Sequence, residues 1–450
     1  MGKRHVIVIN VAGLSPRHLE QREVIPNLSS LMKQGITAPL HPIFPALTCP
    51  VQASILTGTT PDQHGIVANG FLDRTTLEPC FWEQSAYLVQ QPQIWDVLKR
   101  KNREMKTAVL FWQNTLFANS DVVITPRPLH LESGMVPWCY SRPAGLYEGL
   151  AKVLGEFDLR HYWGPMASLK SSEWIMGAAM EVLKNQMPDL LMVYLPHLDY
   201  SSQKFGIGTD VERKDLQEVD RLIGNIIQTV DDLRLRDRTA FLILSEYSIV
   251  NVTGAVCLNR IFRKEGLLSV REIQGKEYPD FEMSRAFAVA DHQVAHVYVK
   301  PGDVERVRKI MEATEGVGEV WGDEEKRAHR IHHERSGELV AVACPDKWFA
   351  YYWWEDPEKA PDFTRTVDIH RKPGYDPLDL FFDPKTRSIS TDTQLIKGSH
   401  GVLPQGDSQK ACLILGGALP DHLERRGTYH VVEIAGLIER LLEPAAALRP

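Results

Sequence analysis

The chain has 450 residues and a formal net charge of −7, with 43% hydrophobic and 24% charged residues. This length exceeds what one simple hydrophobic core usually organises, so we expect one large domain with an inserted lobe. The acidic balance argues against a general nucleic-acid binder, whose surface would be basic. The negative net charge does not exclude a small anionic substrate that binds in a locally positive pocket.

The first residues, MGKRHVIVINVAGL, place basic residues before an apolar run, as a secretory signal does. The run is only about ten residues long and no small-residue cleavage site follows, so we expect a buried first strand instead. No segment approaches the roughly 20 apolar residues that a membrane span needs. The six cysteines are scattered without a CxxC pair, which is typical of free thiols in a reducing compartment, and we predict a cytoplasmic location.

Short apolar runs predict buried strands at His5–Val11, Thr107–Phe111, Asp189–Tyr194, Ala240–Leu244 and Ala411–Leu415. Between them, apolar residues recur at steps of three and four, most clearly in Val211–Leu235 and Ser172–Lys184, which predicts amphipathic helices. Alternating strands and helices predict an α/β fold with a doubly wound, mostly parallel sheet.

The pattern changes between about residue 260 and residue 350. A strand at Ala295–Lys300, a helix at Gly302–Ala313 and a strand at Gly318–Trp321 predict a small inserted α+β lobe, and the charged stretch Gly322–Glu338 predicts a solvated connection. We divide the chain into residues 1–260 (first part of the core), 261–347 (inserted lobe) and 348–450 (C-terminal part of the core). The aromatic and Pro-rich segment Trp348–Phe382 predicts a long ordered loop near a functional surface.

Chemically notable residues follow the predicted strands. Asp199 follows the third strand, Glu246 follows the fourth, and His400 lies in a GSHG segment just before the last. Since ligands of open α/β sheets bind beyond the carboxyl ends of the strands, we expect these three side chains at one edge.

Thr48 lies two residues before Pro50, which suits the first turn of a helix running to about Thr57. A threonine at this position is either a plain N-cap or a hydroxyl beside an anion that the helix N-terminus attracts. The local sequence alone favours the cap.

Three blocks resemble, in order and spacing, the nucleotide pyrophosphatase/phosphodiesterase family of the alkaline phosphatase superfamily. They are IPNLSSLMKQGI (25–36), FPALTCPVQASILTGTTPDQHGIVAN (44–69) and GSHG (398–401). The resemblance extends over nearly the whole chain and is weakest in the inserted lobe. It implies an alkaline-phosphatase-like fold, a nucleophilic Thr48, and an Asn69 that donates a hydrogen bond to the phosphoryl oxygen.

Members of that family hold two divalent metals, usually zinc. The resemblance maps one metal site onto Ala12, Thr48, Glu246 and Tyr247, and the other onto Asp199, Gln203 and His400. Alanine offers no ligand, neutral tyrosine binds zinc poorly, and the glutamine carbonyl suits harder cations. We therefore expect no binuclear zinc centre, and an incomplete site for one divalent metal (Zn, Mn, Mg or Ca) at Asp199, His400, Gln203 and Glu246.

Other residues would replace the missing charge or contact the substrate. On an extended segment His197 points the same way as Asp199, and Tyr247 joins it as a substrate-binding candidate. The loop VDIHRKPGYDP adds His370, Arg371 and Lys372, whose charge suits a phosphate. The cluster of Asp291, His292 and His296 is more simply a strand entrance, and the aromatic run 348–354 more simply packing between lobe and core.

The sequence favours a hydrolase of phosphodiesters, phosphonates or phosphomonoesters with Thr48 as nucleophile. One alternative is a non-catalytic anion-binding protein on the same fold, which the lost metal ligands favour. The other is a transferase with a site rebuilt around His197, Asp199 and residues 368–376. The expected partner is a small anionic ligand containing phosphate or phosphonate, and neither a nucleic-acid polymer nor a membrane is expected.

Overall fold

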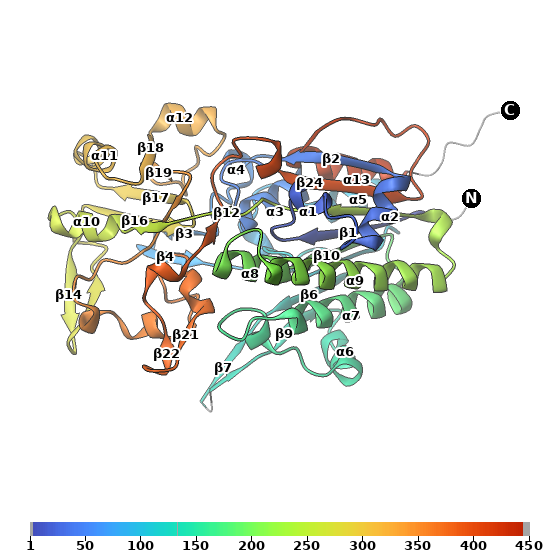
Figure 1. Ribbon diagram of the computed structural model, residues 1–450, viewed down its shortest axis with the longest axis horizontal. Helices are drawn as coiled ribbons and strands as arrows, with labels where there is room; N and C mark the ends of the chain where they lie inside the picture. Colours follow the sequence, from blue (N-terminus) through green and yellow to red (C-terminus); the bar gives the residue numbers. More distant parts are fainter. Residues whose placement is uncertain (1–2, 133, 444–450) are drawn as a thin grey trace.

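A nine-stranded sheet lies at the centre of the computed structural model, which describes residues 3–132 and 134–443 (Figure 1). The strand order is β25-β2-β24-β11-β1-β10-β5-β6-β9. The strands are β1 (His5–Val11), β2 (Ile36–His41), β5 (Thr107–Leu110), β6 (Val122–Pro126), β9 (Cys139–Arg142), β10 (Leu190–Leu195), β11 (Thr239–Leu244), β24 (Ala411–Gly417) and β25 (Tyr429–His430). Each strand predicted for this sheet is present, with ends that differ by at most two residues.

The central strands are apolar throughout because both faces of the sheet are covered. All residues of β1, β10 and β11 are buried, as expected for parallel strands between helices. The strands β11, β1, β10, β5 and β6 run parallel. In contrast, β24 runs antiparallel to both β11 and β2, and β9 runs antiparallel to β6. The prediction of a mostly parallel α/β sheet is confirmed, with β24 as a reversed strand inside it.

Helices cover both faces of the sheet. One group, α2 (Pro26–Gln34), α7 (Leu169–Gln186) and α9 (Asp210–Asp232), packs together on one face, and α3 (Thr48–Thr57) packs with α13 (Ile434–Leu442) on the other. The remaining helices of this part are α1 (Pro16–Leu19), α4 (Pro61–His64), α5 (Ile94–Lys101), α6 (Leu146–Leu154) and α8 (His197–Phe205). In the part of the chain that the structure describes, no helix combines the length and apolar character that crossing a membrane requires.

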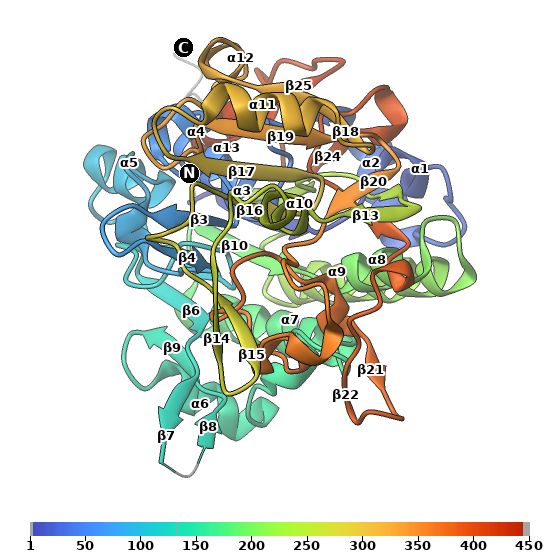
Figure 2. The same cartoon turned by 90° about the vertical axis from the view of Figure 1, so that its left-hand side faces the viewer.

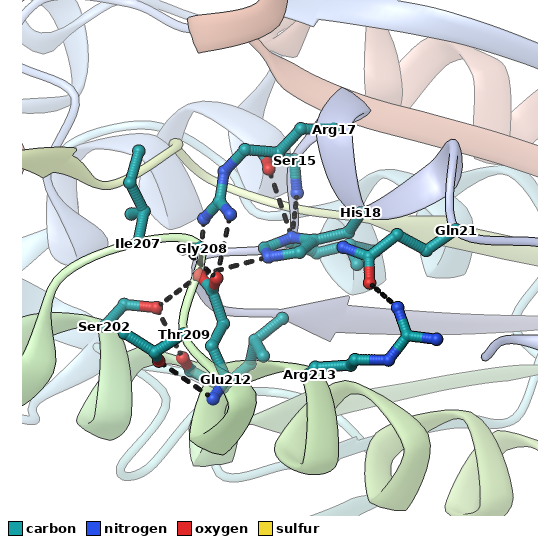
Figure 3. Close-up of polar contacts among 12 residues, drawn as sticks. Ser15, Arg17, His18, Gln21, Ser202, Ile207, Gly208, Thr209, Glu212 and Arg213 are labelled. Atoms are coloured by element: carbon teal, nitrogen blue, oxygen red, sulfur yellow. Dashed lines mark hydrogen bonds and ion pairs between the residues drawn. The ribbon is translucent and has the colours of Figure 1, made fainter.

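A buried ion cluster fixes α8 and the start of α9 against α1 (Figure 3). Glu212 of α9 accepts hydrogen bonds from both terminal nitrogens of the Arg17 guanidinium, from the Ser202 hydroxyl at 2.8 Å and from the Gly208 amide at 2.7 Å. His18 lies 3.2 Å away. Burial alone would raise the pKa of Glu212, but the hydrogen bonds from Arg17 and the nearby His18 outweigh it and hold that pKa well below its usual range.

A second, smaller sheet forms the lobe that faces the viewer in Figure 2. Its order is β16 (Ala286–Asp291), β17 (Val294–Val299), β19 (Leu339–Ala343) and β18 (Val317–Trp321), with α10 (Leu258–Lys264), α11 (Val304–Glu312) and α12 (Asp323–Ala328) beside it. The predicted strand–helix–strand unit is present, and β16 and β19 complete it. The expectation of a solvated connection at 322–338 is wrong, because this stretch contains α12 and buries Lys326. The domain boundaries themselves stay a prediction.

Short two-stranded pairs complete the structure. They are β3 (Gly70–Asp73) with β4 (Glu78–Phe81), β7 (Leu129–Leu131) with β8 (Gly134–Val136), β12 (Val250–Asn251) with β23 (Gly398–Ser399), β13 (Gly254–Val256) with β20 (Lys347–Phe349), β14 (Val270–Ile273) with β15 (Lys276–Pro279), and β21 (Phe382–Asp383) with β22 (Ser388–Ile389). The aromatic run 348–354 is buried in the hydrophobic core of the lobe, so it packs as expected.

Candidate functional site

The antiparallel strand β24 explains how residues far apart in sequence meet at one edge of the sheet. β10 leads into Asp199 on α8, and β11 leads into Glu246, both at the carboxyl ends of parallel strands. Because β24 runs the opposite way, the segment that precedes it, with His400, reaches the same edge. The convergence expected from the sequence therefore follows from the topology.

Gly398 sets how closely this last segment approaches α8. A Cβ at this position would lie only 2.2 Å from the carbonyl oxygen of Ser202, so any larger residue would push the segment away. The amide of Lys397 donates to the Gln203 carbonyl at 3.0 Å and holds the same contact. Glycine at position 398 thus places His400 against the helix that carries Asp199.

A cavity of about 830 Å³ opens at this edge. Thr48, Asp199, Tyr247 and His292 are among the residues that line it. Its walls are mostly apolar and aromatic, formed by Trp82, Phe111, Leu159, Tyr162, Trp163, Met166, Tyr194, Tyr200, Val367, Ile369 and Tyr375. Arg160, Arg371 and His370 also line it. The cavity therefore combines a few polar and charged side chains with mostly apolar and aromatic walls.

Thr48 is the first residue of α3 and one of the residues that line this cavity. Leu47, with an extended backbone, occupies the N-cap position, so the plain-cap interpretation of Thr48 is wrong. The Thr48 hydroxyl lies 3.3 Å from the hydroxyl of Tyr247. A hydroxyl at a helix N-terminus experiences the positive end of the helix dipole, which favours an anion beside it.

Asn69 supports the start of α3 rather than lining the cavity. Its side-chain oxygen accepts the Cys49 amide hydrogen at 2.9 Å, and its side-chain nitrogen donates to Asp291 at 3.1 Å. The second carboxylate oxygen of Asp291 accepts the backbone amide of Asn69 at 2.8 Å. Burial raises the pKa of Asp291 to about 6. The predicted contact of Asn69 with a phosphoryl oxygen stays a prediction.

Two buried carboxylates near Thr48 hold protons more tightly than usual. Glu246 accepts hydrogen bonds on one oxygen from Asn10, at 2.5 Å, and from Gln52, while its other oxygen has no partner. Asp199 accepts from Gln203 at 2.7 Å, and its other oxygen also lacks a partner. Burial raises the pKa of Glu246 to about 8 and that of Asp199 to about 7.

Four aromatic rings stack beside these carboxylates. Tyr247 lies on His400 with ring centroids 3.4 Å apart, His400 lies 3.9 Å from His292, and His292 lies 3.6 Å from Tyr375. His400 donates from Nδ1 to the Ala46 carbonyl at 2.8 Å, which leaves the buried Nε2 without a partner. Burial holds the pKa of both histidines well below the usual value, so both rings are neutral.

These residues do not fit a pair of zinc ions. Ala12 has no ligand atom, and burial raises the pKa of the Tyr247 hydroxyl far above its usual range. Both polar atoms of the Gln203 side chain already form hydrogen bonds, because its nitrogen donates to Asp199 and its oxygen accepts from the Tyr375 hydroxyl at 2.7 Å. Within residues 3–132 and 134–443, the ligand atoms of Asp199, Glu246 and His400 do not form a group close enough for one ion.

Two predicted substrate residues lie elsewhere. His197 begins α8, so the segment is helical rather than extended, and positions two apart on a helix point in different directions. The ring contacts Asp215 and Glu218 of α9 instead of the cavity. Lys372 is buried between Asp376 and Asp379, at 2.8 and 2.6 Å, so its charge is neutralised within the protein. In contrast, Tyr247, His370 and Arg371 line the cavity, and their contact with a substrate stays a prediction.

The sequence interpretation undervalued Asp291 and His292 and missed Asn10 and Gln52. His292 reaches the cavity because it occupies the turn between β16 and β17 with a φ of 56°, and this conformation was not predicted from the sequence. Gln52 could have been predicted as a site residue, because it lies one helical turn after Thr48 and therefore on the same face of α3.

Comparison with known proteins gives a consistent result. The family model for type I phosphodiesterase/nucleotide pyrophosphatase matches residues 6–376. An uncharacterized pyrophosphatase/phosphodiesterase of Schizosaccharomyces pombe is 26% identical over 257 residues, which cover 54% of this chain and 44% of that protein. Ectonucleotide pyrophosphatase/phosphodiesterase 2 of Saccharomyces cerevisiae is 26% identical over 272 residues, 56% of this chain and 49% of that protein. The chain therefore spans about half or less of the length of these relatives.

Solved structures share the fold over almost the whole chain. Phosphonoacetate hydrolase from Sinorhizobium meliloti, in complex with phosphonoformate, aligns with a TM-score of 0.64 at 17% identity, covering 99% of this chain and 96% of that chain. Murine ectonucleotide pyrophosphatase/phosphodiesterase 5 aligns with a TM-score of 0.62 at 15% identity, with the same coverage. The match over residues 6–376, together with this fold, places the chain in the type I phosphodiesterase/nucleotide pyrophosphatase family.

Proposed function

We propose that the protein is a phosphoric ester hydrolase, acting on a phosphodiester, phosphonate or phosphomonoester, with Thr48 as nucleophile. The observation that carries the proposal is the position of Thr48, which is the first residue of α3 and lines the cavity. In the proposed reaction the Thr48 hydroxyl loses its proton and its oxygen bonds to phosphorus. The bond from phosphorus to the leaving atom, which is oxygen in an ester and carbon in a phosphonate, breaks and that atom takes a proton. Water then cleaves the threonyl ester.

The walls of the cavity support a substrate with an apolar or aromatic group. A phosphoryl group at Thr48 would leave the rest of the substrate among Trp82, Phe111, Tyr162 and Trp163. Burial of apolar surface contributes about 25 cal/mol per Å², so a ring-bearing ester gains affinity from these walls. AMP and phosphonoformate, each bound by a protein of this fold, are small phosphate- or phosphonate-containing ligands of the same general kind.

The metal requirement of this site is part of the proposal. Asp199, Glu246 and His400 each keep one buried oxygen or nitrogen without a partner. These atoms lie too far apart in this structure to hold one ion together, so a single divalent ion (Zn, Mn, Mg or Ca), with Gln203 beside it, would draw the three side chains closer. Such an ion, when bound, would supply positive charge beside the phosphoryl oxygens. A pair of zinc ions is excluded from the proposal. We also propose a cytoplasmic location, which the six free cysteines support.

The test measures release of p-nitrophenol from p-nitrophenyl phosphate esters by the wild type and by Thr48→Ala and Thr48→Ser, each with and without added Mn²⁺, Mg²⁺, Ca²⁺ or Zn²⁺. We expect Thr48→Ala to lose at least a thousandfold in kcat and Thr48→Ser to retain part of it. Ester binding without turnover in the wild type at every metal concentration would instead support an anion-binding protein.

A further inference from the structure

A second group of metal-ligand side chains lies outside the cavity, between α8 and α9. It consists of His197 at the start of α8 and of Asp215 and Glu218, which are three residues apart on α9 and so share one face of that helix. The Nε2 atom of His197 lies 3.2 Å from Asp215 Oδ1 and 3.3 Å from Glu218 Oε2, and the three ligand atoms all lie within 4.8 Å of one another. Across residues 3–132 and 134–443, no other three His, Cys, Asp or Glu side chains come this close.

His197 is a buried ring without hydrogen bonds. The residue is 6% exposed, and neither ring nitrogen has a hydrogen-bond partner. The two carboxylate oxygens are close to Nε2, but they do not meet the geometry of a hydrogen bond from it. A buried polar group left in this state costs about 1–3 kcal/mol. A bound cation would satisfy the ring nitrogen and both carboxylates.

The spacing of the ligand atoms suits a tetrahedral metal ion. Zinc binds imidazole nitrogen at about 2.0–2.1 Å and carboxylate oxygen at about 2.0–2.2 Å, so tetrahedral ligand atoms lie about 3.4 Å apart. Both distances from His197 Nε2 are close to that value. The side chain of Glu218 is 27% exposed, so solvent reaches the group and a water molecule can complete the coordination.

We propose that His197, Asp215 and Glu218 bind one divalent metal ion of the zinc class. The ion would hold the N-terminal end of α8 to α9, while the Arg17–Glu212 cluster of Figure 3 holds the other end of α8. Asp199 lies two residues after His197, so the ion would position α8 without contacting the substrate. This site is independent of the function proposed for Thr48.

The test counts zinc per chain by elemental analysis after dialysis against zinc at one fixed free concentration. We expect the wild type and Thr48→Ala to bind one zinc ion more than His197→Ala and Glu218→Gln, whose affinity at this site falls at least tenfold. The matched control is His332→Ala, which removes a histidine that lies 3.4 Å from a single carboxylate, Asp323, in an exposed pair. This control should bind as much zinc as the wild type.

A second measurement separates a metal site from a plain ion pair. We expect added zinc to raise the Tm of the wild type and of Asp199→Asn, but not that of Glu218→Gln. Since Glu218 is partly exposed, this variant should fold even if His197→Ala does not. The proposal would be overturned if Glu218→Gln bound as much zinc as the wild type. It would also be overturned if Asp199→Asn lost the ion instead, or if added zinc left the Tm of the wild type unchanged.

Discussion

The ring of Tyr247 lies flat on the imidazole of His400, with centroids 3.4 Å apart and planes inclined by 7°. Both residues occupy positions where the resemblance to the family implies metal ligands. The tyrosine covers one face of the histidine, and its hydroxyl contacts Thr48. A substitution at a single position therefore removes a ligand and also fills part of the space in which an ion would lie.

Restoring the lost ligands should restore zinc binding beside Thr48. We expect the triple variant Ala12→Asp, Gln203→His, Tyr247→His to bind at least one zinc ion more than its parent, because each change adds a nitrogen or oxygen ligand. Both proteins should carry Glu218→Gln, so that the group between α8 and α9 does not contribute. Elemental analysis gives the count. Equal zinc content would mean that the assignment of these positions is wrong.

Stability should fall as the pH rises, because buried Glu246 resists ionisation. In the unfolded chain this carboxyl ionises near its ordinary pKa of about 4.3, whereas in the folded protein it keeps its proton up to about pH 8. The folded state thus binds more protons between these values, and each pH unit costs up to about 1.4 kcal/mol of unfolding free energy. Asp199 adds to this slope up to about pH 7.

Glu246→Gln removes that contribution. We expect urea unfolding at pH 5 and pH 8 to show a smaller loss of stability in Glu246→Gln than in the wild type, since glutamine keeps the acceptor for Asn10 and Gln52. The exposed Glu20→Gln is the control, with a wild-type slope. The same slope in Glu246→Gln would show that Glu246 ionises normally in the folded protein.

Lys372 should be essential for stability, although it does not line the cavity that contains Thr48. Lys372→Met leaves Asp376 and Asp379 buried without their cation, and removing one partner of a buried ion pair costs about 3–5 kcal/mol. The neighbouring Arg371→Met breaks only exposed ion pairs, which contribute about 0–1 kcal/mol. Chemical unfolding of both variants makes the comparison, and equal losses would contradict this account.

Gly398→Ala should displace the segment that carries His400. Its new methyl group would lie 2.2 Å from the Ser202 carbonyl, and forcing extra volume into a packed site costs about 1–3 kcal/mol. Gly406→Ala is the control, because no atom lies within 4 Å of a methyl group there. We expect a lower Tm and reduced turnover only in Gly398→Ala. A wild-type Tm in Gly398→Ala would mean that the segment can shift freely.

The apolar walls should determine which esters are hydrolysed. We expect kcat/KM to rise about tenfold or more from methyl to phenyl to naphthyl p-nitrophenyl phosphate, since each larger group buries more apolar surface. Met166→Asp at the cavity wall should reduce this preference, whereas Met283→Asp, at another exposed methionine in the lobe, should not. Equal kcat/KM values for all three esters would argue against an apolar substrate.

The core of the fold was predictable because its strands are continuous apolar runs. β1 and β11 were found almost residue by residue, and the steps of three and four identified α9. The sequence analysis predicted no strand at β16, although its residues are mostly apolar. It also predicted no helix at α12, whose charged sequence buries Lys326 through hydrogen bonds to the Gly337 and Glu338 carbonyls. Tertiary contacts of this kind leave no periodic signal.

The site was predictable only where chain topology decides it. Asp199, Glu246 and His400 share an edge because strands of known direction lead there. Side-chain direction was not predictable: His197 turned away once its segment became a helix, and Lys372 turned inward to two aspartates. His292 entered the cavity through a turn with positive φ, which a histidine seldom adopts.

The reversed strand β24 also constrains when the protein can become complete. Residues 411–417 lie between β11 and β2, so a growing chain presents two unpaired strand edges until this stretch leaves the ribosome. Assembly of the nine-stranded sheet must therefore wait until residues 411–417 have been synthesised, and shorter nascent chains expose strand edges that can pair with one another.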